Sequence, residues 1–435
     1  MTLNYSIKSL IKLTIPIMMG QIGQMLIGAG DVYVASKYST NSVAAIGIAN
    51  GVINPVFLFG VGLMMGISPS LAIFRGENKS SNHSLFTVSI YGLICGLCMT
   101  MICIGVNQFV PYMGFDHHIV ASIQKYTYIV SWSFPFALAF QAIKEYLQAK
   151  EEVFIPNLFS LVAVVVNLVL NYLLVFGIGA FKGYGEVGLA LASVSIRVIL
   201  YFCILIYAFD KHTSLKFSKD LAIHIFKFSF PIAFMFFLEV LAFCTVTILS
   251  GTIGVVAAAS NNIIMTMASI AFMIPLSISS AVAVKIGHAY GQKNFARIKS
   301  FTLAALVITS IFIFVSASSF FLFPTSIMNF MSSDSEVINL GVRLLFIVAI
   351  FQISDGMQVV LAGILRGLKF TKISSILVLV SYWLIGIPIG YYLAFHKNQG
   401  AQGLWIGLAI ALSLCAIFLG LFTKVKLSRV DFNFI

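Results

Sequence analysis

Long uninterrupted apolar stretches constrain the fold of this chain more than any other feature. Twelve of them follow one another along the 435 residues. An α-helix needs about 20 mainly apolar residues to cross a bilayer, whereas a membrane β-strand needs about 10 residues of alternating polarity. Because the stretches are long and do not alternate, they predict an all-α integral membrane protein with twelve transmembrane helices. These helices are expected near residues 10–31, 43–73, 86–109, 122–143, 155–177, 187–209, 224–249, 255–284, 301–323, 337–364, 373–395 and 401–423.

Composition agrees with a membrane protein and argues against other classes. Hydrophobic residues make up 60% of the chain and charged residues 9%, against about 25% charged residues in soluble domains. The net charge is +12, but the basic residues are spread over short loops, so we expect no nucleic acid partner. All six cysteines lie in apolar stretches. We therefore interpret the Cys95-Gly-Leu-Cys98 pair as packing, not as a metal or redox motif.

The distribution of basic residues predicts the orientation in the membrane. With the N-terminus inside the cell, the inside segments hold 20 Lys and Arg residues and the outside segments hold 5. Segments that carry the excess of Lys and Arg face the cytoplasm. We therefore expect a multi-pass protein of the cytoplasmic (inner) membrane, surrounded by the lipid bilayer, with both termini in the cytoplasm.

The two halves of the sequence resemble each other. IKLTIPI (11–17) matches FKFSFPI (226–232), which places Pro16 opposite Pro231. SLAIFRGENKSSN (70–82) matches KIGHAYGQKNFAR (285–297), which places Gly76 opposite Gly291. Parallel six-helix repeats are typical of transporters with two bundles. The repeat predicts an N-terminal six-helix bundle at 1–213 and a C-terminal one at 214–435, pseudo-symmetric around a central cavity.

Three acidic residues, Asp31, Glu239 and Asp355, lie inside or at the end of apolar stretches. A charge at mid-bilayer costs roughly 2.5–3.5 kcal/mol on insertion scales, so such residues usually line a cavity or bind an ion. The repeat places Gln24 opposite Glu239 and Val246 opposite Asp31. The carboxylates therefore break the internal symmetry, and we expect them to be the cation-coupling residues.

The residues around these acids suggest how a coupling site would work. Burial raises the pKa of a carboxyl group and a bound cation lowers it, so a buried carboxylate can take up and release a proton or a cation. Gln352 and Gln358 lie three residues either side of Asp355, near its helical face. Glu239 has only apolar neighbours one turn away, so its partner must come from another helix, and we expect Asp355.

Further polar and aromatic residues complete the candidate site. Asn167 and Asn171 are four residues apart on one helix face. They either support Asp31 or only form hydrogen bonds between helices. Gln24, the repeat equivalent of Glu239, is a further candidate supporting polar residue. An organic cation could use an acid as counter-ion and an aromatic ring for a cation–π contact. The candidate cavity-lining residues near the acids are Phe236, Phe237, Phe243, Phe351 and Met357.

With these features in place, the chain resembles the multidrug and toxic compound extrusion (MATE) family, most closely its NorM-type branch. The matching pieces run over nearly the whole length and keep their order and spacing. They are Pro16 followed by Asp31, GVGLMMGISPSLAIFRGENK (60–79), NLVLNYLLVFG (167–177), Pro231 followed by Glu239, IPLSISSAVAVKIGHAYGQKN (274–294) and SDGMQVVLAGILRGLK (354–369).

The resemblance implies a cation-coupled antiporter, in which an inward gradient of Na⁺ or H⁺ drives export of organic, mostly cationic and amphipathic compounds. The family's coupling acids in helices 7 and 10 match Glu239 and Asp355, and its helix 1 acid matches Asp31. Its polar residues in helix 5 match Asn167 and Asn171. Na⁺ is expected at Glu239 and Asp355, with H⁺ the other candidate, although Phe351 replaces a tyrosine of the NorM-type branch and carries no oxygen ligand. The resemblance implies no cofactor, and we expect a monomer.

Two other functions are compared with the antiporter on the basis of the residues inside the predicted helices. A flippase for lipid-linked or polysaccharide precursors, from the same superfamily, is the alternative, but intramembrane charges that are mainly acidic favour cations. An intramembrane enzyme is disfavoured because no predicted helix holds a histidine near a nucleophile. No GxxxxGK[ST] loop is present, so an ion gradient, not bound ATP, is the expected energy source.

Overall fold

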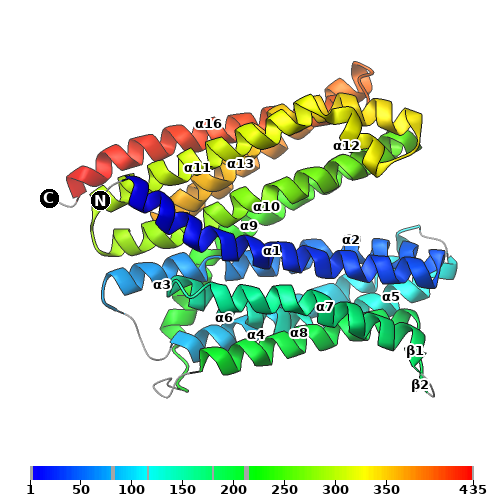
Figure 1. The fold of residues 1–435 in the computed structure, drawn as a ribbon, viewed down its shortest axis with the longest axis horizontal. Coiled ribbons are helices and arrows are strands. Elements are labelled where there is room, and N and C mark those ends of the chain that lie inside the picture. Colours follow the sequence, from blue (N-terminus) through cyan, green and yellow to red (C-terminus); the bar gives the residue numbers. More distant parts are fainter. Residues whose placement is uncertain (1–2, 80–83, 115–116, 179–180, 210–214, 434–435) are drawn as a thin grey trace. The chain divides into compact units, whose positions relative to one another are not determined.

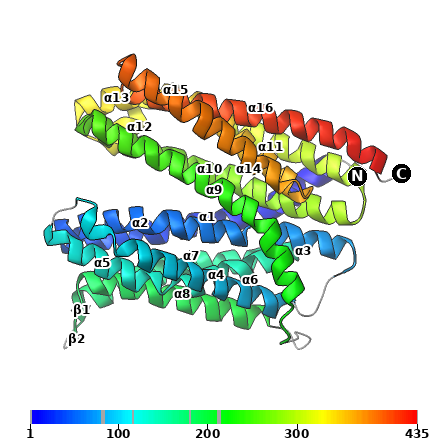
Figure 2. The ribbon, with the colours of Figure 1, turned by 180° about the vertical axis from the view of Figure 1, so that it is seen from behind.

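The fold is known from a computed structural model that describes residues 3–79, 84–114, 117–178, 181–209 and 215–433. These residues are almost entirely helical (Figures 1 and 2). The all-α membrane architecture predicted from the sequence is confirmed. Besides the helices, the described residues form one short hairpin, in which β1 (Gly177–Ile178) pairs antiparallel with β2 (Phe181–Lys182).

The chain divides into two compact units. The N-terminal unit comprises Ile15–Leu71 and Asn78–Ala233, and the C-terminal unit comprises Met1–Thr14, Ala72–Glu77 and Phe234–Ile435. The division into six-helix bundles at 1–213 and 214–435 stays a prediction.

Helices of the first half pack in the N-terminal unit around α6, which contacts α4 and α8. Ile143 of α6, Leu85 of α4 and Ile196 of α8 are fully or almost fully buried in this core. The elements of this half are α1 (Leu3–Tyr38), α2 (Thr40–Met64), α3 (Ile67–Gly76), α4 (Ser84–Asn107), the 3₁₀-helix η1 (Val110–Tyr112), α5 (His117–Ser131), α6 (Phe134–Ala149), α7 (Phe154–Phe176) and α8 (Glu186–Ala208).

In the C-terminal unit, α13 is the central helix and contacts α10, α11 and α16. It begins after Asp334, whose carboxylate accepts hydrogen bonds from the backbone N–H groups of Glu336 and Val337. The elements of this half are α9 (Lys219–Ile253), α10 (Val255–Gly291), α11 (Phe295–Leu322), α12 (Pro324–Met331), α13 (Ser335–Gly367), α14 (Thr371–Val378), the π-helix η2 (Leu379–Gly386), α15 (Ile387–Tyr391), the π-helix η3 (Tyr392–His396) and α16 (Ala401–Asn433).

Eleven helical segments among the described residues are long and apolar enough to cross a membrane. The twelfth predicted span, 122–143, is not one continuous helix. It is divided into α5 and α6 by a turn at Trp132 and Ser133, just before Pro135. Proline has no N–H and clashes with the preceding turn, so it favours a new helix start at this position.

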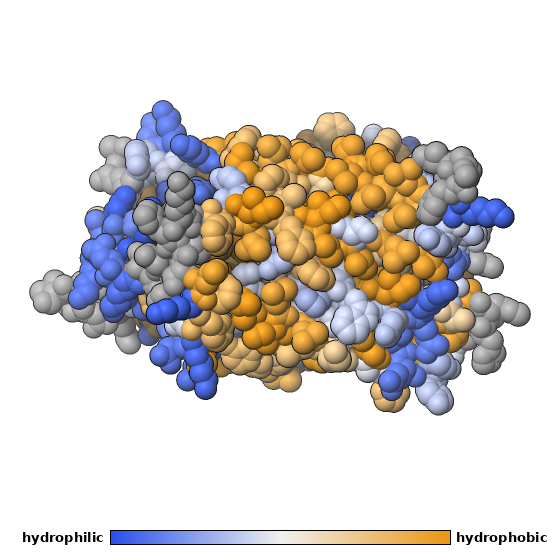
Figure 3. All heavy atoms as spheres, turned by 90° about the horizontal axis from the view of Figure 1, so that it is seen from below, coloured by the Kyte–Doolittle hydropathy of each residue, from blue (hydrophilic) through white to orange (hydrophobic). Residues whose placement is uncertain are grey.

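A second break lies in the predicted span 43–73, where α2 ends at Met64 and α3 begins at Ile67. Gly66 lies in this break, and a β-carbon there would lie within 2.8 Å of Cα of Ser229. Figure 3 shows hydrophobic residues across the middle of one face of the molecule and hydrophilic residues at both ends, as expected for helices that cross a membrane.

Close helix packing depends on glycine in several places. Gly92 and Gly96 lie one turn apart on α4 and face α6. A β-carbon at Gly92 would lie 2.6 Å from Cα of Ala139, and one at Gly96 would meet the backbone of Pro135 at a similar distance. Small residues spaced four apart let membrane helices approach closely. The α4–α6 contact therefore requires both glycines.

The repeat-related glycines Gly76 and Gly291 pack against each other in the C-terminal unit. A β-carbon on either residue would lie 2.9 Å from Cα of the other. A β-carbon would also collide with a backbone carbonyl at each position, with that of His288 at Gly76 and with that of Ile73 at Gly291. Residues 73 and 288 are related by the same offset of 215 as the glycines, so the contact itself is symmetric under the sequence repeat.

A glycine substitution tests the packing of α4. We expect Gly92→Val to lower the unfolding free energy by about 1–3 kcal/mol, because the added carbons must displace the α6 backbone. Gly105→Val is the matched control on the same helix, since a β-carbon at Gly105 meets nothing within 4 Å. Thermal unfolding in detergent measures both. Equal losses for the two variants would show that the α4–α6 contact is not tight.

Candidate functional site

The C-terminal unit holds a buried cluster around Glu239 of α9. Its carboxyl oxygen Oε1 accepts a hydrogen bond from Nε2 of Gln358 at 2.7 Å and lies 3.1 Å from the hydroxyl of Tyr382. The same hydroxyl lies 3.0 Å from Oε1 of Gln358. These three side chains come from α9, α13 and η2 and are 6% exposed or less. The predicted residues Glu239 and Gln358 are therefore in direct contact.

Asp355 of α13 interacts electrostatically with Glu239 and is buried like it. No hydrogen bond joins the two carboxyl groups, and Asp355 has no hydrogen-bond partner within the part of the chain that the structure describes. Oε1 of Gln352, one turn before Asp355, is also buried without a partner. Two carboxylates so placed repel each other, and an added proton or cation relieves that repulsion.

Tyr382 was missed by the sequence reasoning, because a tyrosine in an apolar stretch has no distinctive pattern. It lies in η2, and π-helical turns frequently occur at functional sites. The next residue, Trp383, donates its indole N–H to the carbonyl of Leu238 at 3.1 Å, directly before Glu239. Two consecutive residues of η2 thus bind two consecutive residues of α9.

The candidate aromatic residues divide into two groups. Phe243 and Phe351 belong to the acidic cluster, since the Phe243 ring lies 6.1 Å from the ring of Phe351 and 6.5 Å from that of Tyr382. The Phe351 ring also packs 5.4 Å from Trp405. Phe236 and Phe237 are half-buried on α9, within two helical turns before Phe243.

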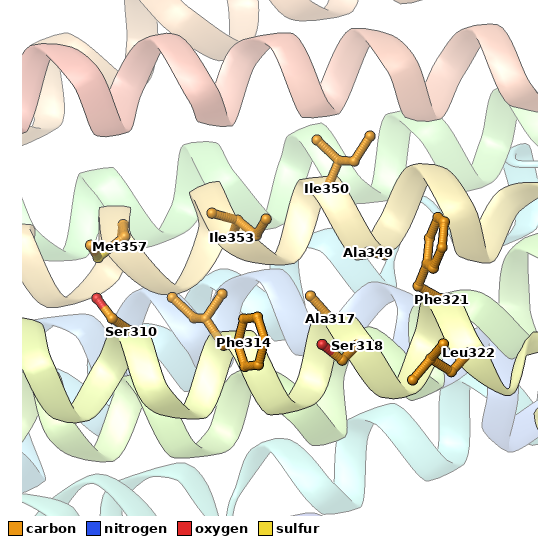
Figure 4. Close-up of a pocket in the computed structure, with 11 residues that line it drawn as sticks. Ser310, Phe314, Ala317, Ser318, Phe321, Leu322, Ala349, Ile350, Ile353 and Met357 are labelled. Carbon is orange, nitrogen blue, oxygen red and sulfur yellow. The ribbon is translucent and has the colours of Figure 1, made fainter.

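Met357 lies away from the acidic cluster. It lines an open groove of about 500 Å³ between α11 and α13, together with Ser310, Phe314 and Ile353 (Figure 4). Phe314 is 74% exposed and Ile353 49% exposed. The groove is thus an apolar depression on the outside of the helices, separate from the carboxylates.

The N-terminal unit holds a second buried carboxylate, Asp31 of α1. Its Oδ1 accepts a hydrogen bond from Nδ2 of Asn171 at 2.7 Å, and its Oδ2 accepts one from the hydroxyl of Ser193 at 2.8 Å. Asn171 also donates to Oδ1 of Asn167 at 3.1 Å. The structure therefore joins Asp31 to both predicted asparagines and adds Ser193 of α8, which the sequence did not single out.

A cation lies close to Asp31. Arg197 of α8 and the phenol of Tyr126 both interact electrostatically with its carboxylate. The guanidinium donates to the hydroxyl of Ser133 at 2.5 Å and lies 5.1 Å above the ring of Phe57. The sequence shows Arg197 inside an apolar stretch, but only the fold places it beside Asp31.

Gln24 belongs to a different polar group. It donates to Oε1 of Gln141 at 3.4 Å, and Gln141 donates to Glu145 at 3.1 Å. Gln148 donates to the other oxygen of Glu145 and to Ser68. Glu145 is buried, because α6 continues past it to Ala149. Gln24 is therefore not part of the hydrogen-bonded group around Asp31.

Comparison with known proteins places the chain in a family. The sequence profile named MatE matches residues 16–173 and 231–392, one segment in each half of the chain. The chain belongs to the MatE family. Proteins of this family are membrane transporters and not enzymes, so the buried carboxylates are to be understood in terms of transport.

Relatives and solved structures agree with this assignment. The chain is 27% identical over 430 residues to the multidrug resistance protein NorM of Photobacterium profundum, covering 95% of this chain and 94% of that protein. It is 29% identical over 431 residues to NorM of Vibrio vulnificus, with coverage of 95% and 94%. The fold is similar to the eukaryotic MATE transporter AtDTX14, with a TM-score of 0.87, 18% identity and complete coverage of both chains. A MOP superfamily transporter from Pyrococcus furiosus gives a TM-score of 0.86 at 18% identity, covering 98% and 97%.

No group of three or more His, Cys, Asp or Glu residues within the described ranges could hold a metal ion. For Na⁺, the oxygens without a hydrogen bond in the described part of the chain are Oε2 of Glu239, the carboxyl oxygens of Asp355 and Oε1 of Gln352, since both bonds of Glu239 go to Oε1. These three side chains would provide part of a Na⁺ site. Na⁺ prefers several oxygen ligands, so others would have to complete the coordination shell.

Removing the hydroxyl of Tyr382 tests the acidic cluster. We expect Tyr382→Phe to lower the unfolding free energy by about 1–3 kcal/mol, because it leaves a buried acceptor without a donor. Tyr391→Phe is the matched control in the same membrane segment, since Tyr391 is 46% exposed. Thermal unfolding in detergent compares the two variants. Equal stability of both would mean that the Tyr382 bond contributes nothing.

Proposed function

We propose that the chain is a secondary-active multidrug efflux antiporter, which exchanges an inward Na⁺ or H⁺ for organic, mostly cationic compounds by alternating access. The observation that carries the proposal is the pair Glu239 and Asp355, buried in membrane helices of a MatE chain whose relatives bear the name multidrug resistance protein. A cation or proton bound at these acids and a cationic substrate would compete for the same charge. Competition of this kind makes the two binding events mutually opposed, which is the basis of exchange.

The hydrogen bonds at Glu239 support H⁺ as the ion bound there. The Tyr382 hydroxyl has one hydrogen but lies near two acceptors, Glu239 and Gln358. With Glu239 ionised, that hydrogen serves only one of them. With Glu239 protonated, its carboxyl O–H can donate to the Tyr382 hydroxyl. The Tyr382 hydroxyl then donates to the amide oxygen of Gln358, and the amide nitrogen of Gln358 donates to the carboxyl group of Glu239. Every group in the ring then has a partner, so the arrangement suits the protonated state.

Asp355 and Gln352 offer the second cation position. Asp355 has no hydrogen-bond partner in the described part of the chain, and the Gln352 amide oxygen lacks one as well. This position would take either Na⁺ or the cationic group of a substrate. Phe243 and Phe351 border the cluster and would supply aromatic contact to an organic cation.

We further propose a monomer in the cytoplasmic (inner) membrane with both termini in the cytoplasm. The excess of 20 inside over 5 outside basic residues supports this orientation. The bundles 1–213 and 214–435 would alternate between inward-open and outward-open states, as parallel six-helix repeats do in other transporters.

Efflux from proteoliposomes tests the function. Ethidium export is measured with the pH gradient and the Na⁺ gradient varied separately, in wild type, Asp355→Asn and Glu336→Gln. We expect the pH gradient to drive export, and Asp355→Asn to reduce the rate by about tenfold or more. Glu336→Gln is the matched control, because Glu336 is an exposed acid on the same helix.

Each other outcome has a defined meaning. Export driven by Na⁺ alone would contradict proton binding at Glu239 but retain the antiporter. Export that survives Asp355→Asn and is lost in Asp31→Asn would move coupling to the N-terminal unit. Failure of folded wild-type protein to export any cationic dye would reject the function.

A further inference from the structure

Basic side chains gather at one end of the C-terminal unit, the end that holds the start of α1 and the end of α16 (Figure 1). Among the described side chains there, eleven exposed or half-buried Lys and Arg residues accompany one acidic residue, Glu77. The matching segments of the N-terminal unit hold five such basic and three such acidic residues. The segments counted are 3–14, 72–77, 285–299, 369–372 and 424–428 in the first case, and 78–79, 150–152 and 215–227 in the second. The positive-inside rule orients the whole chain, so it does not by itself explain an excess confined to one unit.

Three of these lysines, Lys372, Lys424 and Lys426, lie at the ends of apolar membrane spans. The span Thr371–His396 begins one residue before Lys372, and the span Ala401–Ser428 ends just after the other two. The rings of Phe370 and Phe422 lie 5.7 Å apart, which joins the start of α14 to the end of α16 (Figure 2). Aromatic and basic side chains at the end of a span lie at the depth of the lipid headgroups. The three span-end lysines are therefore at the height of lipid phosphates.

An exposed apolar surface leads away from two of the span-end lysines. On α14, Ile376 follows Lys372 by four residues and is 54% exposed. On α16, Leu421 and Ile417 precede Lys424 by three and seven residues and are 57% and 55% exposed. Residues with these spacings share a helix face. Each face thus combines an apolar surface with a cation at its end, which is complementary to a phospholipid, whose apolar acyl chains end at a phosphate.

The third span-end lysine is held in place by the two aromatic rings. Nζ of Lys426 lies 4.8 Å from the ring centroid of Phe370 and 5.3 Å from that of Phe422, a cation–π geometry. A side chain that is already ordered loses less freedom on binding. Lys369, by contrast, is paired with Glu77 at 3.5 Å. No carboxylate within the described ranges pairs with a span-end lysine, so their charges are open to an anion.

We propose that this end of the C-terminal unit binds anionic phospholipids. The lipid phosphate lies at the three span-end lysines, and the acyl chains lie along the exposed faces of α14 and α16. A phospholipid suits this surface better than a soluble anion, because only a lipid uses both the cations and the apolar faces. The inference goes beyond the proposed efflux function and does not depend on it.

Two lipids with identical acyl chains test the inference. Dioleoyl phosphatidylglycerol carries a net negative charge, whereas dioleoyl phosphatidylcholine adds a choline cation to the same phosphate. Native mass spectrometry of the full-length protein in detergent gives the dissociation constant of each lipid. We expect wild type to bind phosphatidylglycerol more tightly. In the double variant Lys372→Gln with Lys424→Gln, this affinity should fall by about fivefold for each lysine, about 25-fold in all, while the affinity for phosphatidylcholine stays the same.

Two further double variants sharpen the comparison. Lys219→Gln with Lys227→Gln removes two exposed lysines from the part of α9 that belongs to the N-terminal unit, and it should leave both affinities unchanged. Lys372→Arg with Lys424→Arg keeps both charges and should retain the preference. Glycerol 3-phosphate, added at constant ionic strength, should not displace the lipid, because it has no acyl chains. Size-exclusion chromatography and thermal unfolding establish that each variant is folded.

The inference is overturned if wild type binds the two lipids equally, a result that needs no variant at all. It is also overturned if the folded glutamine variant keeps the preference. An equal loss in the control pair would overturn it as well, because basic residues anywhere on the surface would then suffice. Displacement by glycerol 3-phosphate would show that the site takes a soluble phosphate and not a lipid. No step of this test measures transport, so failure of the proposed efflux function leaves its result unchanged.

Discussion

A buried carboxyl group in a membrane helix needs hydrogen-bond donors from other helices. In each unit, these hydrogen bonds join three helical elements. Asp31 joins α1 to α7 and α8 through Asn171 and Ser193. Glu239 joins α9 to α13 and η2 through Gln358 and Tyr382. In a medium of low dielectric these bonds are strong, and an unmet acceptor is costly. Under the proposed function, a proton or cation bound at either carboxyl group would change the hydrogen bonds between three helices and so link ion binding to helix movement.

Much of this arrangement could be predicted from the sequence, and the remainder depended on backbone geometry. Long apolar runs are enough to predict membrane helices, and a carboxylate inside such a run is conspicuous, as with Asp355. The spacing of Asn167 and Asn171 predicted that both lie on one helix face, and in the structure Asn171 donates to both Asn167 and Asp31. Tyr382 could not be found in this way, because the π-helical turn that aims it at Glu239 leaves no signature in residue types. Met357 was assigned to the cavity because it is close to Asp355 in sequence. A side chain two residues further along a helix points in a different direction, and Met357 lines the outer groove instead.

The internal repeat is visible both in the residues and in their contacts. Gly76 and Gly291 occupy equivalent positions in the two halves. A β-carbon at Gly76 would collide with the carbonyl of His288, and one at Gly291 with the carbonyl of Ile73, and these two carbonyls also occupy equivalent positions. A contact that is symmetric under the repeat requires a small residue on both sides at once. This explains why the two halves kept glycine here, while they differ at the carboxylates. Packing between two repeated elements constrains the residue at the contact in both halves, whereas a binding site can be built from the residues of one half alone.

The two sites also differ in net charge. Glu239 and Asp355 bring two carboxyl groups together, so the first added positive charge relieves repulsion. Asp31 already lies near Arg197, so an added positive charge there has no repulsion to relieve. Under the proposed function, this difference favours the C-terminal unit for uptake of the coupling ion, because only there does the first bound positive charge relieve repulsion between two carboxyl groups.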